Sequence, residues 1–394
     1  MPIRIGGTTQ DRATYDPEFD GYVSYDDPDP LIPPMGLTYG PKFFDLIREH
    51  LGCRATRRGF ANAGSLQPYS QWQKPVAVPP WNKSQEGADN ADWAQDFINT
   101  YKPKWPILSG GDYAVSIPLQ PGWPNTNYLI EEAYNATIKK YTKFYNGHLY
   151  ALSNSTILAE EMAHNKTVAD LPTFEDKIAL AHSVARPYIL GETNFHGIDE
   201  VMDASFGAAI QTVDKSLKAV SMGLKHLYYH QGTINQANFN LFLSNQVNTP
   251  FYGGYFSVLA LAGGEYVSAF DVGDDAYTQY VIYKAGKPSR IVLINAGYYS
   301  GSGTRSSVVF TLTCLSAVEN AFLRALRLTT PSSDSVTTRE QQDPLHEVSI
   351  TRQFFSNADC SILGDHVVEE VTVVADGIVE AELLASEALL VYLP

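Results

Sequence analysis

The sequence predicts an α/β fold followed by an all-β region: a (β/α)8-type TIM barrel, incomplete in this chain, and then an antiparallel β-sandwich domain. Over residues 1–250, short apolar runs alternate with amphipathic helical segments, which is typical of a parallel sheet with helical crossovers. After about residue 250, short strand-like runs separated by turn residues take over, which is typical of an antiparallel sandwich. We therefore expect a truncated barrel domain over 1–250 and a sandwich domain over 251–394.

The ends of the predicted strands favour a barrel over a doubly wound sheet. They carry Gly, Glu, His and Gln residues, and chemically active side chains gather at the carboxyl ends of barrel strands. No G-x-G-x-x-G sequence follows a predicted strand, and no Walker sequence occurs. Because only about five strands precede the sandwich and eight close such a barrel, the barrel is expected to be incomplete.

The spacing of apolar residues predicts the individual elements. The clearest helix covers 203–223, because its apolar residues recur on one stripe and Gly223 provides a stop signal. Further helices are expected over 40–52, 90–101, 127–145, 155–164 and 173–185. Strands of the barrel region are expected over 2–7, 106–117, 147–152, 187–192 and 224–232. Strands of the sandwich are expected over 265–272, 277–285, 289–296, 306–313, 369–377 and 380–393.

The composition is that of an ordinary globular protein, with 44% hydrophobic residues, 18% charged residues and a net charge of −15. Such an acidic chain without a broad basic patch is not expected to bind nucleic acid or an anionic membrane. Its three cysteines lack the spacing of metal ligands, so we expect no metal and no cofactor. No apolar stretch is long enough to span a bilayer.

One carboxylate stands at the end of a predicted buried strand. The apolar run from Tyr188 to Leu190 reaches a glycine and then Glu192. A buried charge is costly unless it is paired or used, and a lone Glu at the carboxyl end of a barrel strand is often catalytic. The alternative is that Glu192 is simply the first exposed residue of a loop. These residues alone leave both interpretations open.

Several motifs resemble fungal glycoside hydrolase family 79, which comprises β-glucuronidases and heparanase-like enzymes. The motifs are IRIGGTTQD at 3–11, ILGETN at 189–194, SFGAA at 205–209, YYHQGT at 228–233, RLTTPSSDS at 327–335 and ASEALLVYL at 385–393. The resemblance implies a retaining glycosidase that removes terminal glucuronic acid from glycans or glycoconjugates. It also implies that Glu192, in the GETN motif, is the catalytic nucleophile. The expected partner is thus a carbohydrate glucuronide.

The second carboxyl group of a retaining mechanism is not identifiable in the sequence. The family places its acid/base glutamate in an Asn-Glu-Pro motif at the end of the fourth barrel strand, and this chain contains no Asn-Glu pair. Residues 53–89, near which that strand is expected, show no clear period. The acid/base residue therefore remains unknown. The alternative functions are a catalytically impaired homologue, such as a pseudoenzyme or carbohydrate-binding protein, or a truncated gene product.

The resemblance also suggests which residues contact the sugar. We expect a substrate-binding role for His148 and Tyr150 at one strand end and for His230 and Gln231 at another. Asn194 lies in the loop that helps to bind the glucuronate carboxylate in the family. For His148, a hydrogen-bonded core histidine is the alternative. Four other glutamates lie on predicted helices and are not proposed as the acid/base: Glu131, Glu132, Glu160 and Glu161.

The family is secreted, and four N-x-S/T sequons, at Asn82, Asn135, Asn154 and Asn165, agree with a secreted glycoprotein. The first ten residues, MPIRIGGTTQ, do not form a signal peptide. We expect the chain as given to remain in the cytosol and the intact gene product to be secreted. The oligomeric state is not predicted.

Overall fold

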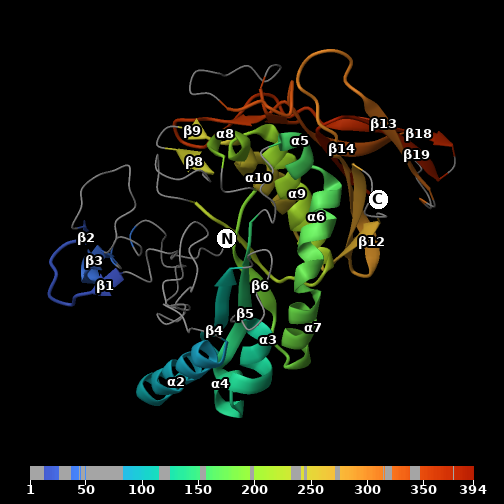
Figure 1. The fold of residues 1–394 in the computed structure, drawn as a ribbon. Coiled ribbons are helices and arrows are strands. Elements are labelled where there is room, and N and C mark those ends of the chain that lie inside the picture. Colours follow the sequence, from blue (N-terminus) through green and yellow to red (C-terminus); the bar gives the residue numbers. More distant parts are fainter. Residues whose placement is uncertain are drawn as a thin grey trace. The chain divides into compact units, whose positions relative to one another are not determined.

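The computed structural model describes residues 13–25, 37–43, 45, 49, 83–114, 125–150, 157–195, 199–231, 241–243, 246–270, 276–313, 315, 322–337, 347–375 and 377–394. The chain divides into two compact units (Figure 1). The first unit comprises residues 1–149, 176–193 and 224–229. The second comprises residues 150–175, 194–223 and 230–394.

A four-stranded parallel sheet lies in the first unit. Its strands are β4 (Leu108–Ala114), β5 (Thr142–Leu149), β6 (Tyr188–Thr193) and β7 (Leu227–Tyr229), in the order β4-β5-β6-β7. All six residues of β6 are buried, as expected for a strand of a parallel sheet that is covered on both faces. β4, β6 and β7 coincide largely with predicted strands and β5 overlaps one only at its carboxyl end, so the predicted parallel α/β region is confirmed.

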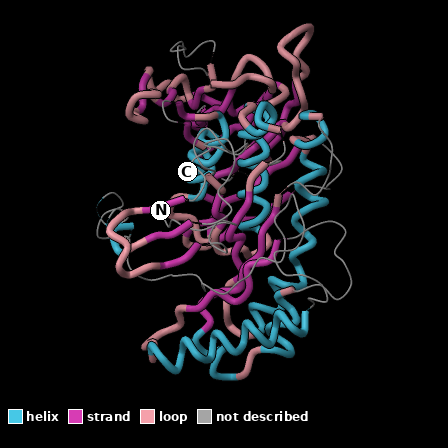
Figure 2. The backbone as a smooth tube through the Cα atoms, turned by 60° about the vertical axis from the view of Figure 1, so that its left-hand side comes forward, coloured by secondary structure: helices cyan, strands magenta, loops and turns pink. Residues whose placement is uncertain are grey.

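The helices of the first unit are α2 (Lys83–Tyr101), α3 (Thr126–Tyr128), the π-helical turn η2 (Leu129–Ala133), α4 (Ala136–Tyr141) and α7 (Glu175–Ser183), which enters this unit at Asp176. Figure 2 shows these helices in cyan and the strands in magenta. A small sheet of β1 (Ala13–Tyr15), β2 (Val23–Tyr25) and β3 (Leu37–Tyr39), in the order β1-β3-β2, was not predicted. The strand predicted over 2–7 lies outside the described residues, and the helix predicted over 40–52 is described only in part.

The prediction of one continuous helix over 127–145 is wrong. The backbone turns extended at Tyr134 and Asn135, and the Asn135 carboxamide oxygen accepts a hydrogen bond from Ile138 N at 2.9 Å. Asparagine competes with helical hydrogen bonding in this way and favours the N-cap position. α4 then ends at Tyr141, where the Thr142 hydroxyl donates to Ile138 O at 2.9 Å. β5 therefore begins five residues before the strand start that the sequence predicted.

The second unit contains α5 (Leu158–Glu161), α6 (His164–Asp170), η3 (Leu171–Phe174), α8 (Glu200–Asp203), α9 (Phe206–Ser221) and α10 (Thr249–Leu261). The predicted helix over 203–223 is confirmed as α9, with Ser205 as its N-cap and Gly223 in the left-handed region at φ +93°. α10 was not predicted. Two buried polar contacts tie α9 to its surroundings, because Asp214 lies 2.9 Å from His164 Nδ1 and accepts from the Tyr280 hydroxyl at 2.6 Å.

A nine-stranded antiparallel sheet forms most of the second unit, in the order β10-β11-β12-β20-β14-β18-β19-β13, with β15 paired to β14. Its strands are β10 (Tyr266–Phe270), β11 (Tyr277–Lys284), β12 (Lys287–Asn295), β13 (Ser307–Leu312), β14 (Phe322–Thr329), β15 (Ser349–Ile350), β18 (Glu369–Ala375), β19 (Ile378–Leu384) and β20 (Glu387–Tyr392). Two hairpins accompany it: β8 (Phe242–Leu243) with β9 (Gln246–Val247), and β16 (Phe354–Phe355) with β17 (Ile362–Leu363). The expected antiparallel β-region is confirmed.

Alternation along the central strands builds two apolar clusters in the second unit. On β20, Ala388 and Leu390 join the cluster that includes α9 and α10, whereas Leu389 and Val391 join a second cluster with β13 and β19. This period of two is the expected result of burying both faces of a strand. No helix in the described parts of the chain combines the length and the apolar character needed to cross a bilayer.

The close packing of α10 on α9 generates a test with two adjacent glycines. A Cβ on Gly253 would lie 2.2 Å from Ala209 O, whereas a Cβ on Gly254 would meet no atom within 4 Å. We expect Gly253→Ala to lower the free energy of unfolding by about 1–3 kcal/mol, because the two helices must separate. Gly254→Ala should raise it by about 0.5–1 kcal/mol, because alanine favours the helix. Denaturant unfolding measures both, and equal stabilities would contradict this packing.

Candidate active site

Three neighbouring strands of the first unit bring two carboxylates and one imidazole together. His148 on β5 is the register partner of Glu192 on β6, and its Nδ1 lies 3.5 Å from Glu192 Oε2. The other ring nitrogen, Nε2, lies 2.6 Å from Oδ1 of Asp112 on β4. Because an ionised carboxylate only accepts hydrogen bonds, the Nε2–H of His148 points at Asp112. The imidazole is thus held between the two carboxylates.

An asparagine and a glycine hold this arrangement in place. The Asn146 amide donates to the same Asp112 oxygen, and its carbonyl oxygen accepts from Gly191 N at 2.7 Å. A Cβ on residue 191 would lie 2.2 Å from that oxygen, so the GETN motif needs its glycine for close approach to Asn146. The ends of β5 and β6 are joined further on, where the Thr193 hydroxyl donates to Leu149 O at 2.6 Å.

The cluster is almost entirely removed from solvent. His148 is 2% exposed, Asp112 is 5% exposed and Glu192 is 9% exposed. Glu192 therefore lies inside a buried strand and is not the first exposed residue of a loop. Burying a carboxylate is costly unless a partner compensates for the lost water. His148 Nδ1, which lies 3.5 Å from Glu192 Oε2, offsets that cost when both ring nitrogens carry a proton.

Three predicted sugar-contacting residues meet in the second unit. Tyr150 and His230 directly follow β5 and β7 in the chain, and the Tyr150 hydroxyl lies 2.6 Å from His230 Nδ1. The Asn194 amide, two residues after Glu192, donates to His230 O at 2.8 Å. These contacts assemble a hydroxyl, an imidazole and an amide of the kind that recognise sugar hydroxyl groups.

The Gln231 side chain bonds to a different segment. Its amide nitrogen donates to Phe242 O at 3.0 Å, and its carbonyl oxygen accepts from the backbone N–H groups of Leu241 and Phe242 at 2.9 Å. The side chain thus braces the strand β8. Of the four glutamates that were not proposed as acid/base, Glu161 is buried and the other three are exposed: Glu131, Glu132 and Glu160.

Sequence reasoning missed two polar residues of the cluster, Asp112 and Asn146. Asp112 is 5% exposed on β4, just after Gly111, whose φ of +76° marks an irregular strand. Two glycines before an aspartate in a predicted strand indicate an irregular strand, and an irregularity of this kind often changes the direction of a side chain. The sequence therefore contained a signal for Asp112. In the described part of the chain, no group of three or more His, Cys, Asp and Glu side chains has an arrangement that holds a metal ion.

A lysine that the sequence did not single out supports the loop after Glu192. Lys215 on α9 is 1% exposed, and its ammonium group donates to Asn194 O at 2.5 Å. Burial lowers the pKa of Lys215 to about 8, and the nearby charge of Lys166 lowers it further by a smaller amount. Three nearby carboxylates act in the opposite direction and raise this pKa. The carboxylates are those of Asp170, Asp203 and Glu161.

This buried lysine predicts a pH dependence of stability. An ordinary lysine keeps its proton to pH 10.5, whereas folded Lys215 releases it at about pH 8. Below pH 8, folded Lys215 carries its charge, and the cost of burying that charge lowers the free energy of unfolding. Between pH 8 and pH 10.5, the unfolded chain binds more protons than the folded chain, so the free energy of unfolding rises with pH. Relative to Lys215→Met, the wild type should gain roughly 3 kcal/mol across this window. Denaturant unfolding at pH 7, 8, 9 and 10 measures the slope.

The matched control for that experiment is Lys218→Met, on the same helix but partly exposed. It should keep the slope of the wild type. If Lys215→Met and the wild type respond identically to pH, Lys215 is not buried as a charged group.

Comparisons with known proteins place the chain among glycoside hydrolases. Residues 279–390 match the model of the glycosyl hydrolase family 79 C-terminal beta domain. A β-glucuronidase of Aspergillus niger is 25% identical, and the alignment covers 77% of this chain and 66% of that relative. The chain thus spans just under two thirds of the length of this curated relative.

Solved structures agree with the sequence matches. The 4-O-α-L-rhamnosyl-β-D-glucuronidase of Fusarium oxysporum 12S, solved with Rha-GlcA, is 30% identical with a TM-score of 0.84, covering 100% of this chain and 88% of that one. The α-L-arabinofuranosidase of Thermotoga maritima is 12% identical with a TM-score of 0.52, covering 84% and 65%, and shares the fold alone. On the family model and the Fusarium structure together, the chain belongs to glycoside hydrolase family 79.

Proposed function

We propose that this protein is a retaining glycoside hydrolase of the β-glucuronidase type, which removes terminal glucuronic acid from glycans or glycoconjugates. The observation that carries the proposal is Glu192, a carboxylate buried at the carboxyl end of β6 and contacted by His148. Two relatives named as glucuronidases support the substrate class. They also favour a hydrolase over a carbohydrate-binding homologue without activity.

In the proposed mechanism, the Glu192 carboxylate attacks the anomeric carbon and forms a covalent glycosyl-enzyme as the leaving oxygen departs. A second carboxyl group protonates that oxygen and then takes a proton from the water that releases the sugar. His148 exchanges no proton with the substrate in this scheme. Held by Asp112 at 2.6 Å, it keeps the Glu192 oxygens aimed at the anomeric carbon, as an orienting group does for a catalytic side chain.

We further propose that residues 1–250 form a (β/α)8-type barrel domain and residues 251–394 a β-sandwich domain. Four parallel strands in sequential order, joined by three helical crossovers, support the barrel. In barrel enzymes the active site is built at the carboxyl ends of the strands. Glu192 lies there on β6, which agrees with this placement.

The proposed sugar contacts are those of His148, Tyr150, Asn194, His230 and Gln231. Tyr150, Asn194 and His230 are linked by hydrogen bonds in the second unit, which supports a shared role. None of these five residues is proposed as the general acid. Residues 50–82, which include most of the segment where the family motif is expected, lie outside the described residues.

The catalytic proposal predicts the behaviour of three variants with an activated aryl glucuronide, a substrate whose leaving oxygen needs little protonation. Glu192→Gln should lower kcat on the order of 10³-fold or more, because the nucleophile is lost. Asp112→Asn should lower kcat by about 10²-fold with KM nearly unchanged, because the imidazole loses its charged acceptor. Asp96→Asn, an exposed carboxylate on α2, is the matched control and should retain full activity.

Release of the aryl alcohol under saturating and limiting substrate gives both kinetic constants. Wild-type activity in Glu192→Gln would remove Glu192 as the nucleophile. A loss in Asp112→Asn that appears only in KM would mean that Asp112 supports substrate binding and not the orientation of Glu192.

We also propose that this protein is a secreted fungal glycoprotein. Two named relatives are fungal, and the sequon asparagines Asn135 and Asn165 are exposed. Asn82 and Asn154 lie outside the described residues. Expression of its gene should give a secreted product whose mass falls after endoglycosidase treatment. Asn135→Gln should reduce that shift, and a secreted product without any shift would contradict the proposal.

A further inference from the structure

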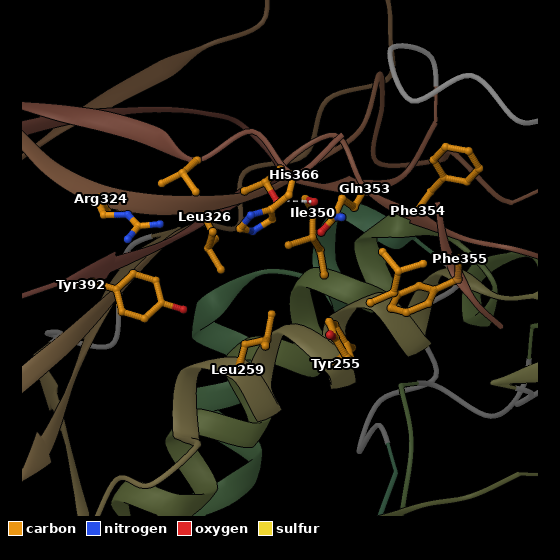
Figure 3. A pocket seen from close by; sticks show the side chains of 13 residues that line it. Tyr255, Leu259, Arg324, Leu326, Ile350, Gln353, Phe354, Phe355, His366 and Tyr392 are labelled. Atoms are coloured by element: carbon orange, nitrogen blue, oxygen red, sulfur yellow. Dashed lines mark hydrogen bonds between the residues drawn. The ribbon is translucent and has the colours of Figure 1, made fainter. Parts of the chain in front are cut away.

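A cavity of about 400 Å³ lies in the second unit, far along the chain from Glu192 (Figure 3). Its floor comes from α10, its walls from β14, β15 and β20, and its rim from the β16–β17 hairpin and the segment before β18. Its polar lining residues include Tyr255, Arg324, Gln353, His366 and Tyr392. A volume of this size suits one or two sugar rings.

The strand pattern explains why this cavity is polar at one end. On β14, Leu328 and Leu326 belong to the apolar cluster with α9 and α10, and the next residue on the same face is Arg324. On β20, Ala388 and Leu390 are followed on that face by Tyr392. The face that is packed by apolar residues at one end therefore bears a guanidinium and a phenol at the other.

Several polar side chains line the cavity, and their polar groups are not engaged by the described part of the protein. Among the described residues, the side chains of Arg324, Gln353, His366, Tyr255 and Tyr392 have no hydrogen-bonded or ion-paired partner. Arg324 opposes Glu370 across the strand pair but forms no ion pair with it in the described part of the chain. Figure 3 shows the Arg324 and Tyr392 side chains at one end of the cavity, with His366 and Gln353 along one side.

Two arginines lie near the Tyr392 hydroxyl at one end of the cavity, although the whole chain carries a net charge of −15. Burial raises the pKa of the Tyr392 hydroxyl, while Arg290 and Arg324 act in the opposite direction. Arg290 is 8% exposed and donates to Leu259 O at 3.0 Å, so its charge is fixed beside the cavity. Arg324 is exposed and available to an anionic ligand.

We propose that this cavity is a non-catalytic binding site for a uronic acid residue, with Arg324 pairing with the sugar carboxylate. Gln353 and His366 supply donors and acceptors for ring hydroxyls, and Tyr255 and Leu259 offer an apolar surface to the ring face. A neutral sugar leaves the guanidinium unused, whereas a guanidinium matches the two oxygens of a carboxylate. The site requires no chemistry at Glu192.

The test is a calorimetric titration of the full chain carrying Glu192→Gln, which prevents turnover, with methyl β-D-glucuronide. We expect a binding event that Arg324→Gln weakens by at least about tenfold, and that methyl β-D-glucoside, which lacks the carboxylate, does not reproduce. Arg352→Gln, an exposed arginine on the next segment that does not line the cavity, is the matched control and should bind like its parent. Circular dichroism confirms that each variant folds.

Unchanged glucuronide binding in Arg324→Gln, or equal binding of the glucoside, would overturn this inference. If a variant does not fold, His366→Ala and Gln353→Ala replace it, with the same expected loss of binding. In the chain that retains Glu192, Arg324→Gln should leave kcat and KM for the aryl glucuronide unchanged. If Arg324→Gln loses glucuronide binding while Glu192→Gln keeps full catalysis, only the proposed nucleophile is refuted. If Arg324→Gln binds like its parent while Glu192→Gln loses catalysis, only the second site is refuted.

Discussion

The candidate site depends on the register between β5 and β6, which sets His148 opposite Glu192. Side chains alternate between the faces of a sheet, so a slip of one residue would turn the imidazole away from the carboxylate. Asn146 helps to hold this register, because one amide binds both Asp112 and the backbone N–H of Gly191. The absence of a Cβ at residue 191 leaves room for the Asn146 carboxamide.

Both units place charged groups in nearly dry surroundings and give each a partner. In the first unit, Asp112 and Glu192 share His148. In the second, Lys215 donates to Asn194 O, and Asp214 accepts from Tyr280 and contacts His164. Buried charges are strongly destabilising when a partner is removed. Such pairs limit the arrangements that these strands and helices can adopt.

The sequence predicted the features that depend on local residue patterns. It missed the features that depend on contacts between residues distant in the chain. Apolar periodicity located β6 and α9, and the resemblance pointed to Glu192 and His148. The helix predicted over 127–145 was wrong because its period continues through Asn135, whose cap interrupts it. α10 was missed because its apolar residues surround the whole helix and leave no amphipathic stripe. Asp112 and Lys215 were missed because the residues that pair with them lie 21 to 36 positions away.

The most direct test of Glu192 as the nucleophile is covalent trapping. A glucuronide with an activated leaving group and a 2-fluoro substituent, which slows release of the glycosyl-enzyme, should form a stable ester with the catalytic carboxylate. Digestion and tandem mass spectrometry of the labelled chain should place one sugar on the peptide that contains GETN, at Glu192. A label on any other carboxylate, with Glu192 unmodified, would contradict the assignment.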